Sequence, residues 1–149
     1  MPEENPREKG TELNLDFSKI KDPKSGKGLV PVIVQHYETK DVLMVAYTDE
    51  GGFKMMLQTR KAAFWSRSRQ KSWIKGEESG NFMDIVHMYI DCDQDTILVL
   101  VAPKGEGKAC HTKDKKGQLR RTCFYRLVLE VDEGRWKLVL RNNTGDSSE

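Results

Sequence analysis

The chain has 149 residues, of which 37% are hydrophobic and 32% are charged, and its formal net charge at pH 7 is +2. These values are typical of one soluble domain that can bury a core, and the chain is too short for two domains of ordinary size. No apolar run approaches the roughly 20 residues that span a bilayer, and the first residues lack the apolar core of a signal peptide. We therefore expect a cytoplasmic protein without a membrane segment, whose net charge indicates no particular partner.

The two ends of the chain differ in composition from its middle. Residues 1–15 and 142–149 are polar and show no hydrophobic periodicity, which predicts disordered tails. Residues 16–141 are predicted to form a single folded domain.

The folded part begins with two runs rich in β-branched residues, at 30–37 and 42–47, and the polar linker between them favours a β-hairpin. Thr48 or Asp49 can then cap a short helix that we expect to end near Thr59. Two glycines in the first turn of this helix each weaken it by about 1 kcal/mol relative to alanine.

The second half of the chain is rich in predicted strands. Residues 62–66 indicate a strand, and a polar segment over 67–81 separates it from a longer strand over 83–91. The run at 96–102 is the expected neighbour of that strand, and two further apolar runs around D-E-G at 132–134 predict a second hairpin. The fold class is therefore α+β, with a mainly antiparallel β-sheet and one or two short helices.

The stretch D-C-D-Q-D at 91–95 places three carboxylates and a thiol next to an apolar strand. If the strand continued to residue 95, Asp91, Asp93 and Asp95 would project from one face and Cys92 from the other. Acids so close together repel one another unless a cation lies among them, and hard oxygen ligands suit Mg²⁺ better than zinc. A solvated turn, in which Asp is common without any function, explains this stretch equally well.

The three cysteines, Cys92, Cys110 and Cys123, are far apart in sequence and form no C-x-x-C pair, so burial in the core is the simpler explanation. Cys110, however, lies in the polar, glycine-rich K-G-E-G-K-A-C-H-T, which is unsuited to a core. Three thiolates would leave the fourth position of a tetrahedral zinc open, as in catalytic sites. His111 could be that fourth ligand or could carry a proton.

Residues 60–75 contain six basic residues and no acid, together with Trp65 and Trp73. Arginine binds phosphate through two parallel hydrogen bonds and serine hydroxyls add donors, so S-R-S-R at 66–69 has the chemistry of a phosphate site. The tryptophans could stack on a base, as in single-strand binders, or could belong to the core. A solvated edge strand guarded by positive charge is the structural alternative.

Taken together, these segments resemble a known enzyme family. The motifs W-S-R-S-R-Q-K-S-W-I-K-G-E-E-S-G-N, Y-I-D-C-D-Q-D, A-C-H-T and T-C-F-Y-R follow one another in the order found in phosphoribosyl-AMP cyclohydrolase of histidine biosynthesis. The likeness runs from about Gly28 to Arg126. The segment K-D-K-K-G-Q-L-R-R at 113–121 departs from the family by lengthening the loop between the last two cysteines.

The resemblance implies a metal-dependent enzyme that is an intertwined homodimer. The metal ligands that it implies are Asp91, Asp93 and Asp95 for Mg²⁺, and Cys110 and Cys123 of one subunit with Cys92 of the other for zinc. His111 is the residue expected to move a proton in catalysis. The residues expected to bind the small-molecule substrate, phosphoribosyl-AMP, are Trp65, Ser66, Arg67, Ser68, Arg69, Lys75, Glu77, Ser79 and Gly80.

The reaction implied by the resemblance is hydrolytic opening of the N1–C6 bond of the adenine ring, with a zinc-activated water attacking C6 to give the carboxamide product. The alternative from another class is a zinc-stabilised single-stranded nucleic-acid binder that uses the same basic and aromatic stretch. That alternative gives no reason for three carboxylates, which would repel phosphate. We therefore expect a small-molecule substrate and no nucleic acid.

Overall fold

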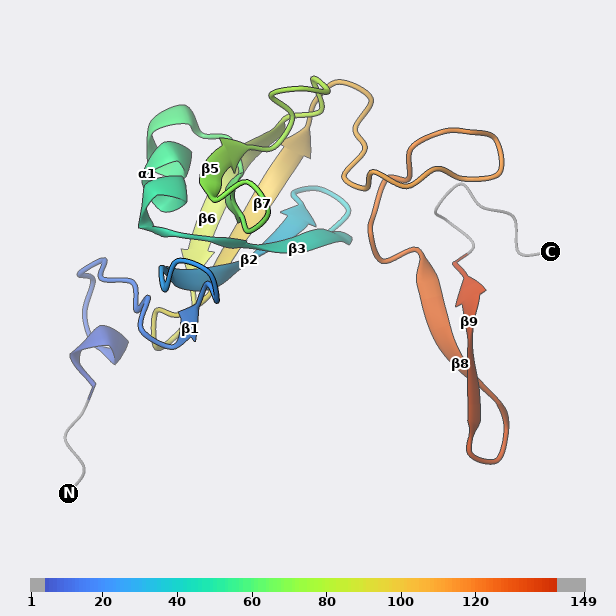
Figure 1. Ribbon diagram of the computed structural model, residues 1–149, viewed down its shortest axis with the longest axis horizontal. Coiled ribbons are helices and arrows are strands. Elements are labelled where there is room, and N and C mark those ends of the chain that lie inside the picture. Colours follow the sequence, from blue (N-terminus) through green and yellow to red (C-terminus); the bar gives the residue numbers. More distant parts are fainter. Residues whose placement is uncertain (1–4, 142–149) are drawn as a thin grey trace.

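The computed structural model describes residues 5–141; residues 1–4 and 142–149, which belong to the two predicted tails, lie outside this range. The described residues form strands and one α-helix, which confirms the α+β class (Figure 1). None of their helices is long and apolar enough to cross a membrane. The elements in chain order are a 3-10 helix Pro6–Glu8, β1 Ile20–Lys21, β2 Gly28–His36, β3 Val42–Thr48, α1 Glu50–Thr59, β4 Ala63–Ser66, β5 Lys71–Ile74, β6 Met83–Ile90, β7 Ile97–Pro103, β8 Arg126–Asp132 and β9 Arg135–Leu140.

Strand β2 is the centre of the main sheet. It pairs antiparallel with β1 and β3, and β7 runs parallel along its other side, with β6 antiparallel to β7. The predicted pairing of 30–37 with 42–47 and of 83–91 with 96–102 is confirmed. The sheet is mixed, because β2 and β7 pair in parallel. This parallel pairing was not predicted. Parallel strands are buried on both faces and have nearly continuous apolar sequences, as the run of β7 has.

The predicted helix is confirmed as α1, which packs against β3, β4 and β5 and buries Phe53 and Met56. Asp49 caps its start, because the Asp49 carboxylate accepts a hydrogen bond from the Gly52 N–H at 2.8 Å. A Cβ at Gly52 would lie 2.1 Å from Thr48 Oγ1. Close packing therefore requires glycine at this position, although glycine is a poor helix former.

The segment 67–81, which was predicted only to be polar, contains strand β5. Strand β4 pairs antiparallel with β5 around a tight turn in which Gln70 has a φ of 52°. Because side chains alternate along a strand, Phe64 and Trp73 lie on one face of this hairpin, and Trp65 and Ser72 lie on the other. The two tryptophans of the basic segment therefore have different surroundings.

The N-terminal segment is tied to the turn between β6 and β7 by one buried side chain, Gln94. Its Nε2 donates to the carbonyls of Arg7 and Glu12 at 3.0 Å each, and its Oε1 accepts from the Asn14 N–H at 2.7 Å. Leu15 is buried. This part of the predicted N-terminal tail is thus anchored in the structure, which the polar sequence did not indicate.

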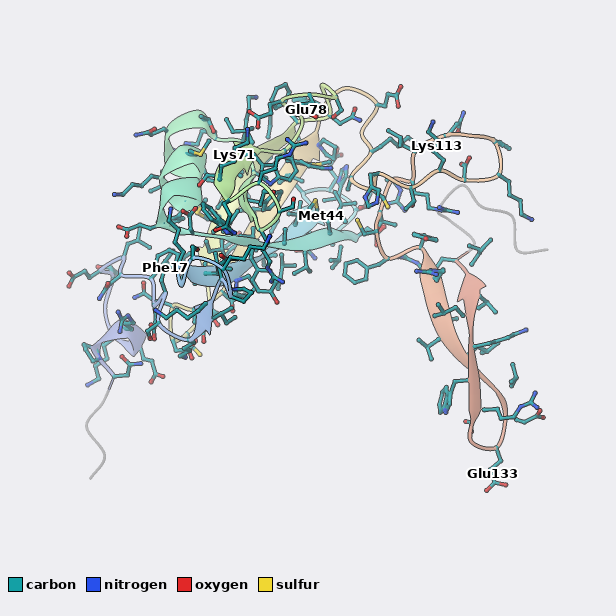
Figure 2. The ribbon with its side chains drawn as sticks, in the orientation of Figure 1. Phe17, Met44, Lys71, Glu78, Lys113 and Glu133 are labelled. Atoms are coloured by element: carbon teal, nitrogen blue, oxygen red, sulfur yellow. The ribbon has the colours of Figure 1, made fainter. Side chains whose placement is uncertain are left out.

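Strands β8 and β9 form the predicted second hairpin, and it projects away from the main sheet (Figures 1 and 2). Its register places Val128 opposite Leu138 on one face and Leu127 opposite Val139 on the other. Val128 is 60% exposed, Leu127 53% and Trp136 62%. Isolated two-stranded hairpins are marginally stable in water, and apolar side chains gathered on a surface are typical of an interaction site.

Candidate active site

The candidate metal ligands lie at opposite ends of strand β7. The D-C-D-Q-D turn lies just before the start of β7. Cys110 lies in the loop that follows Pro103, the last residue of β7. Cys123 lies at the same end as Cys110, because its N–H donates to the carbonyl of Leu43 near the start of β3 at 2.7 Å. A strand of seven residues spans roughly 20 Å at the usual rise per residue. Within one chain, the acids are therefore far from Cys110 and Cys123.

The acid cluster is made by a turn. Strand β6 ends at Ile90, close to the predicted end at residue 91, and does not continue to residue 95. Asp91 Oδ1 accepts hydrogen bonds from the N–H groups of Asp95 at 2.9 Å and Thr96 at 3.1 Å. The ligand atoms of Asp91, Asp93 and Asp95 all lie within 4.8 Å of one another. The three carboxylates thus converge as expected, although the turn rather than strand alternation brings them together.

A lysine ammonium from the N-terminal segment lies at this cluster. Lys19 Nζ is 2.8 Å from Asp93 Oδ2 and 2.7 Å from Asp95 Oδ2. These hydrogen bonds raise the pKa of Lys19, and the bond from Lys19 is the largest cause that lowers the pKa of Asp95. Burial, followed by contact with Asp95, raises the pKa of Asp91. The cluster attracts a cation, and three carboxylate oxygens are donors suited to a hard ion such as Mg²⁺.

Two of the three cysteines form a pair. Cys110 and Cys123 lie close enough to shift each other's pKa, and Cys110 Sγ is 2.9 Å from Thr112 Oγ1. Burial alone would raise the pKa of Cys110, but the hydrogen bonds from Thr112, together with the nearby Cys123, outweigh burial and lower it. Burial and the neighbouring Cys110 raise the pKa of Cys123 to about 11. Soft sulfur donors of this kind suit zinc.

The lengthened loop between these cysteines does not separate them. Main-chain hydrogen bonds of 3.1 Å join Ala109 N–H to Arg121 O and Cys110 N–H to Arg120 O, which closes the base of the loop. Thr122 Oγ1 donates to the Val42 carbonyl at 2.8 Å and holds the returning chain against β3. The insertion at 113–121 therefore extends outward from a closed base, and both cysteines keep their positions.

Cys92, the third expected zinc ligand, and His111, the residue expected to move a proton, are both exposed. Cys92 lies in the β6–β7 turn, and within residues 5–141 it joins no group of three metal ligands with Cys110 and Cys123. His111 directly follows Cys110 and is exposed. A single chain thus brings together two of the three expected zinc ligands.

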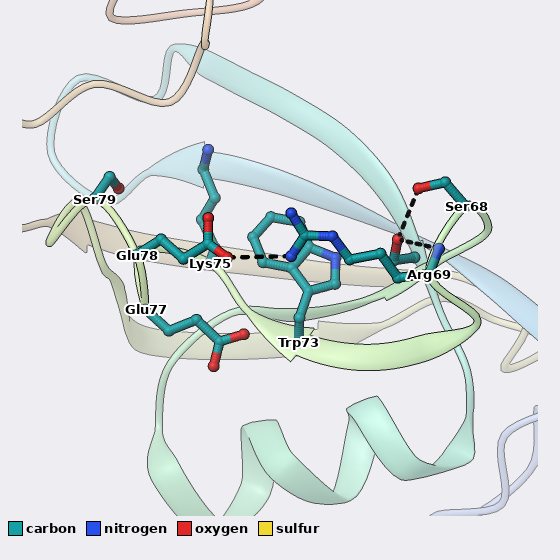
Figure 3. A pocket seen from close by; sticks show the side chains of 9 residues that line it. Ser68, Arg69, Trp73, Lys75, Glu77, Glu78 and Ser79 are labelled. Carbon is teal, nitrogen blue, oxygen red and sulfur yellow. Dashed lines mark hydrogen bonds and ion pairs between the residues drawn. The ribbon is translucent and has the colours of Figure 1, made fainter.

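A cavity of about 360 Å³ lies beside the β4–β5 hairpin (Figure 3), which is a suitable size for a small molecule. The Arg69 side chain reaches across Trp73 to Glu78, and Arg69 Nη1 is 3.2 Å from Glu78 Oε1. Ser66 Oγ accepts a hydrogen bond from the Arg69 N–H at 3.2 Å and so shapes the turn. The residues that line the cavity are Ser66, Ser68, Arg69, Trp73, Lys75, Gly76, Glu77, Glu78 and Ser79.

Lys75 connects this cavity to the thiol pair. It lines the cavity, and its charge interacts with those of Cys123 and Cys110. Burial lowers the pKa of Lys75, and the two thiols oppose this shift. The candidate zinc ligands therefore lie within electrostatic range of a residue that lines the cavity.

Six of the predicted substrate-binding residues line the cavity and three do not. Those that line it are Ser66, Ser68, Arg69, Lys75, Glu77 and Ser79, and those that do not are Trp65, Arg67 and Gly80. The guanidinium carbon of Arg67 lies 4.8 Å from the centre of the Tyr47 ring, and Trp65 is buried on the other face of the hairpin beneath Lys27. The predicted set omitted Gly76 and Glu78, and it omitted Trp73, although the sequence indicated that either tryptophan could stack on a base. Strand alternation would have selected Trp73 over Trp65 if β5 had been recognised.

The fold and the cavity define a small-molecule enzyme with two candidate metal sites. The sequence profile of the phosphoribosyl-AMP cyclohydrolase family matches residues 44–125. A phosphoribosyl-AMP cyclohydrolase of Bacillus cereus is 49% identical over 107 residues, which are 72% of this chain and 98% of that protein. One of Syntrophotalea carbinolica is 42% identical over 124 residues, which are 83% of this chain and 86% of that protein.

A longer relative is the histidine biosynthesis bifunctional protein of Lactococcus lactis, which is 52% identical over 105 residues. The match covers 70% of this chain and 46% of that protein, so this chain corresponds to about half of the bifunctional relative. The chain belongs to the phosphoribosyl-AMP cyclohydrolase family.

Proposed function

We propose that the protein opens the adenine ring of phosphoribosyl-AMP in histidine biosynthesis, by hydrolysis of the N1–C6 bond. The observation that carries this proposal is the position of Lys75, which lines a cavity with Arg69 and also lies within electrostatic range of Cys110 and Cys123. A substrate with two phosphates needs cationic side chains to bind it. Its adenine ring must also lie close to the proposed zinc ligands, where water would be activated. Membership of the family supports this reaction, and a biosynthetic role of this kind fits the cytoplasm.

The residues present fit the two metals expected. Cys110 and Cys123 offer two adjacent sulfur donors, which zinc prefers, and Asp91, Asp93 and Asp95 offer three oxygens, which Mg²⁺ prefers. When bound, zinc would act as a Lewis acid that lowers the pKa of water toward neutrality. Mg²⁺ would neutralise the three carboxylates.

The position of Cys92 supports a homodimer with a shared zinc site. Because Cys92 and the acid cluster lie at the end of β7 remote from Cys110 and Cys123, one chain cannot bring all three thiols together without unfolding the sheet. In a two-fold dimer, the same surface of each chain can supply Cys92 to its neighbour. The exposed apolar faces of the β8–β9 hairpin are suited to such an intertwined arrangement.

Side chains of the cavity have distinct roles in the proposed reaction. Arg69 and Lys75 would bind phosphate, with Ser66 and Ser68 as further donors. Trp73 would stack on a ring of the substrate. His111, next to Cys110, would deliver a proton to N1 as the N1–C6 bond breaks, so that one water is consumed and its oxygen remains on C6.

The direct test is turnover of phosphoribosyl-AMP by purified protein, followed by mass spectrometry. We expect a product heavier by one water, loss of turnover after strong chelation, and recovery when zinc and Mg²⁺ are added together. Undiminished turnover in a fully demetallated sample would remove the metal-dependent mechanism. Absence of turnover with both metals present would remove the proposed activity itself.

A further inference from the structure

One buried carboxylate, that of Asp22, takes no part in the site described above. Asp22 is 1% exposed and lies in a turn closed by its own main-chain bonds to Lys27 and Gly26 at 2.8 Å. Asp22 Oδ2 accepts hydrogen bonds from Ser25 N–H at 2.9 Å and Ser25 Oγ at 2.7 Å. A buried charge is costly unless it is hydrogen-bonded, so a buried acid of this kind calls for an explanation.

The third hydrogen bond to Asp22 comes from the turn of the β4–β5 hairpin. Gln70 Nε2 donates to Asp22 Oδ2 at 3.0 Å and to the Arg67 carbonyl at 2.8 Å. Gln70 itself has a positive φ of 52°, a conformation that non-glycine residues adopt uncommonly. One amide group thus joins the carboxylate to both ends of a four-residue turn that contains Ser68 and Arg69.

The indole of Trp65 lies on the same side as this carboxylate. Asp22 Oδ1 and Trp65 Nε1 are both buried, and neither makes a hydrogen bond of normal geometry in the structure. The Trp65 indole nevertheless contributes to the low pKa of Asp22, which is about 2: burial raises this pKa, and the hydrogen bonds from Ser25 and Gln70, together with the nearby indole, outweigh burial. Asp22 is therefore ionised, and it is joined to the turn between β4 and β5 through Gln70.

We propose that Asp22 is a positioning residue for the anion-binding turn, acting through Gln70. Ser68 and Arg69 line the cavity, are exposed, and lie on a short turn that the Gln70 amide closes by donating to the Arg67 carbonyl. The Asp22–Gln70 bond fixes the carbonyl of Arg67 and hence the direction in which the Arg69 main chain leaves the turn. This inference rests on the proposed function, since it takes Arg69 to bind a phosphate of the substrate.

The test compares three variants, Asp22→Asn, Gln70→Ala and the matched control Ser25→Ala. The first two variants alter the bond between the Asp22 carboxylate and the turn, whereas Ser25→Ala removes a bond to the same carboxylate oxygen from a residue outside the turn. We expect Asp22→Asn and Gln70→Ala to raise KM for phosphoribosyl-AMP about tenfold, which corresponds to one lost hydrogen bond, while kcat changes less than about threefold. Ser25→Ala should lower the melting temperature and leave KM unchanged.

A second measurement, amide hydrogen exchange, separates failure of this inference from failure of the proposed function. Exchange at residues 67–70 should be faster in Asp22→Asn and Gln70→Ala than in Ser25→Ala, whatever reaction the protein catalyses. Wild-type KM in both variants, or an equal rise of KM in Ser25→Ala, would overturn the positioning role. If the wild-type protein has no turnover, the proposed function fails. In that case, hydrogen exchange at residues 67–70 that is no faster in Asp22→Asn and Gln70→Ala than in Ser25→Ala would overturn the positioning role.

Discussion

The thiols of Cys110 and Cys123 lie close enough to shift each other's pKa, at the closed base of the 113–121 insertion. The pKa of Cys110 is lowered, and burial together with Cys110 raises that of Cys123 to about 11. Two thiols are too few for the proposed zinc site. Cys92, at the other end of β7, can complete that site only from a second chain.

The shared zinc site predicts complementation between two inactive variants. Cys92→Ala and the double variant Cys110→Ala, Cys123→Ala should each be nearly inactive, because too few thiolates remain at every site. After subunit exchange, one of the two sites in a heterodimer has all three thiolates. Activity should approach about one quarter of wild type when half of the dimers are mixed. A mixture that stays inactive, although native mass spectrometry shows heterodimers, would mean that the zinc ligands lie within one chain.

The two arginines of S-R-S-R should differ in their contribution to substrate binding. Arg69 lines the cavity, whereas Arg67 stacks on Tyr47 outside it. Arg69→Ala should therefore raise KM about tenfold to a hundredfold, as expected for loss of a charge-assisted hydrogen bond worth about 1.5–3 kcal/mol. Arg67→Ala is the matched control and should change KM less than about threefold. Steady-state kinetics measure KM for both variants. An equal rise of KM in Arg67→Ala and Arg69→Ala would mean that Arg69 has no special role in binding the phosphate.

The β8–β9 hairpin should be required for the proposed dimer. Val128→Asp introduces a charge on a face whose side chains are exposed in a single chain but would be buried between two. Light scattering after size exclusion should show a shift from dimer to monomer, together with loss of activity from the shared site. Leu57→Asp is the control, because Leu57, on α1, is 43% exposed and a surface change usually alters stability by less than about 0.5 kcal/mol. A Val128→Asp dimer of normal stability would show that the hairpin lies outside the interface.

Lys19 should compete with Mg²⁺ for the acid cluster. Its ammonium contacts Asp93 and Asp95 at 2.8 Å and 2.7 Å, so a bound cation must displace it. Calorimetric titration of Lys19→Ala with Mg²⁺ should show about twofold to fivefold tighter binding, because the cation no longer has to displace an ammonium held by a partly exposed ion pair. Lys21→Ala, on the neighbouring strand β1, should bind Mg²⁺ as wild type does. Weaker binding by Lys19→Ala would mean that the lysine supports the metal site.

Local sequence patterns determined most of the elements. The β-branched runs of β2 and β3, the capping carboxylate of Asp49 and the D-E-G turn between β8 and β9 each depend on contacts within a few residues, so their positions follow from the sequence. Strand β5 was missed because K-S-W-I is short and half polar, and its pairing with β4 depends on a turn held partly by the distant Asp22. The hydrogen bonds of Gln94 to the N-terminal segment were also missed, because they join residues that are far apart in sequence.

The chemistry of the candidate site followed from residue type, and its geometry did not. Carboxylates at 91, 93 and 95 and three cysteines indicate hard and soft ligand sets from the sequence alone. Which of them can meet is decided by β7, which joins β2 in parallel and so holds Cys92 and Cys110 at opposite ends of the sheet. Similarly, only the β4–β5 register placed Trp73 in the cavity and Trp65 behind it. Pairing between strands that are distant in sequence depends on the packing of the whole core, which no local pattern of residues specifies.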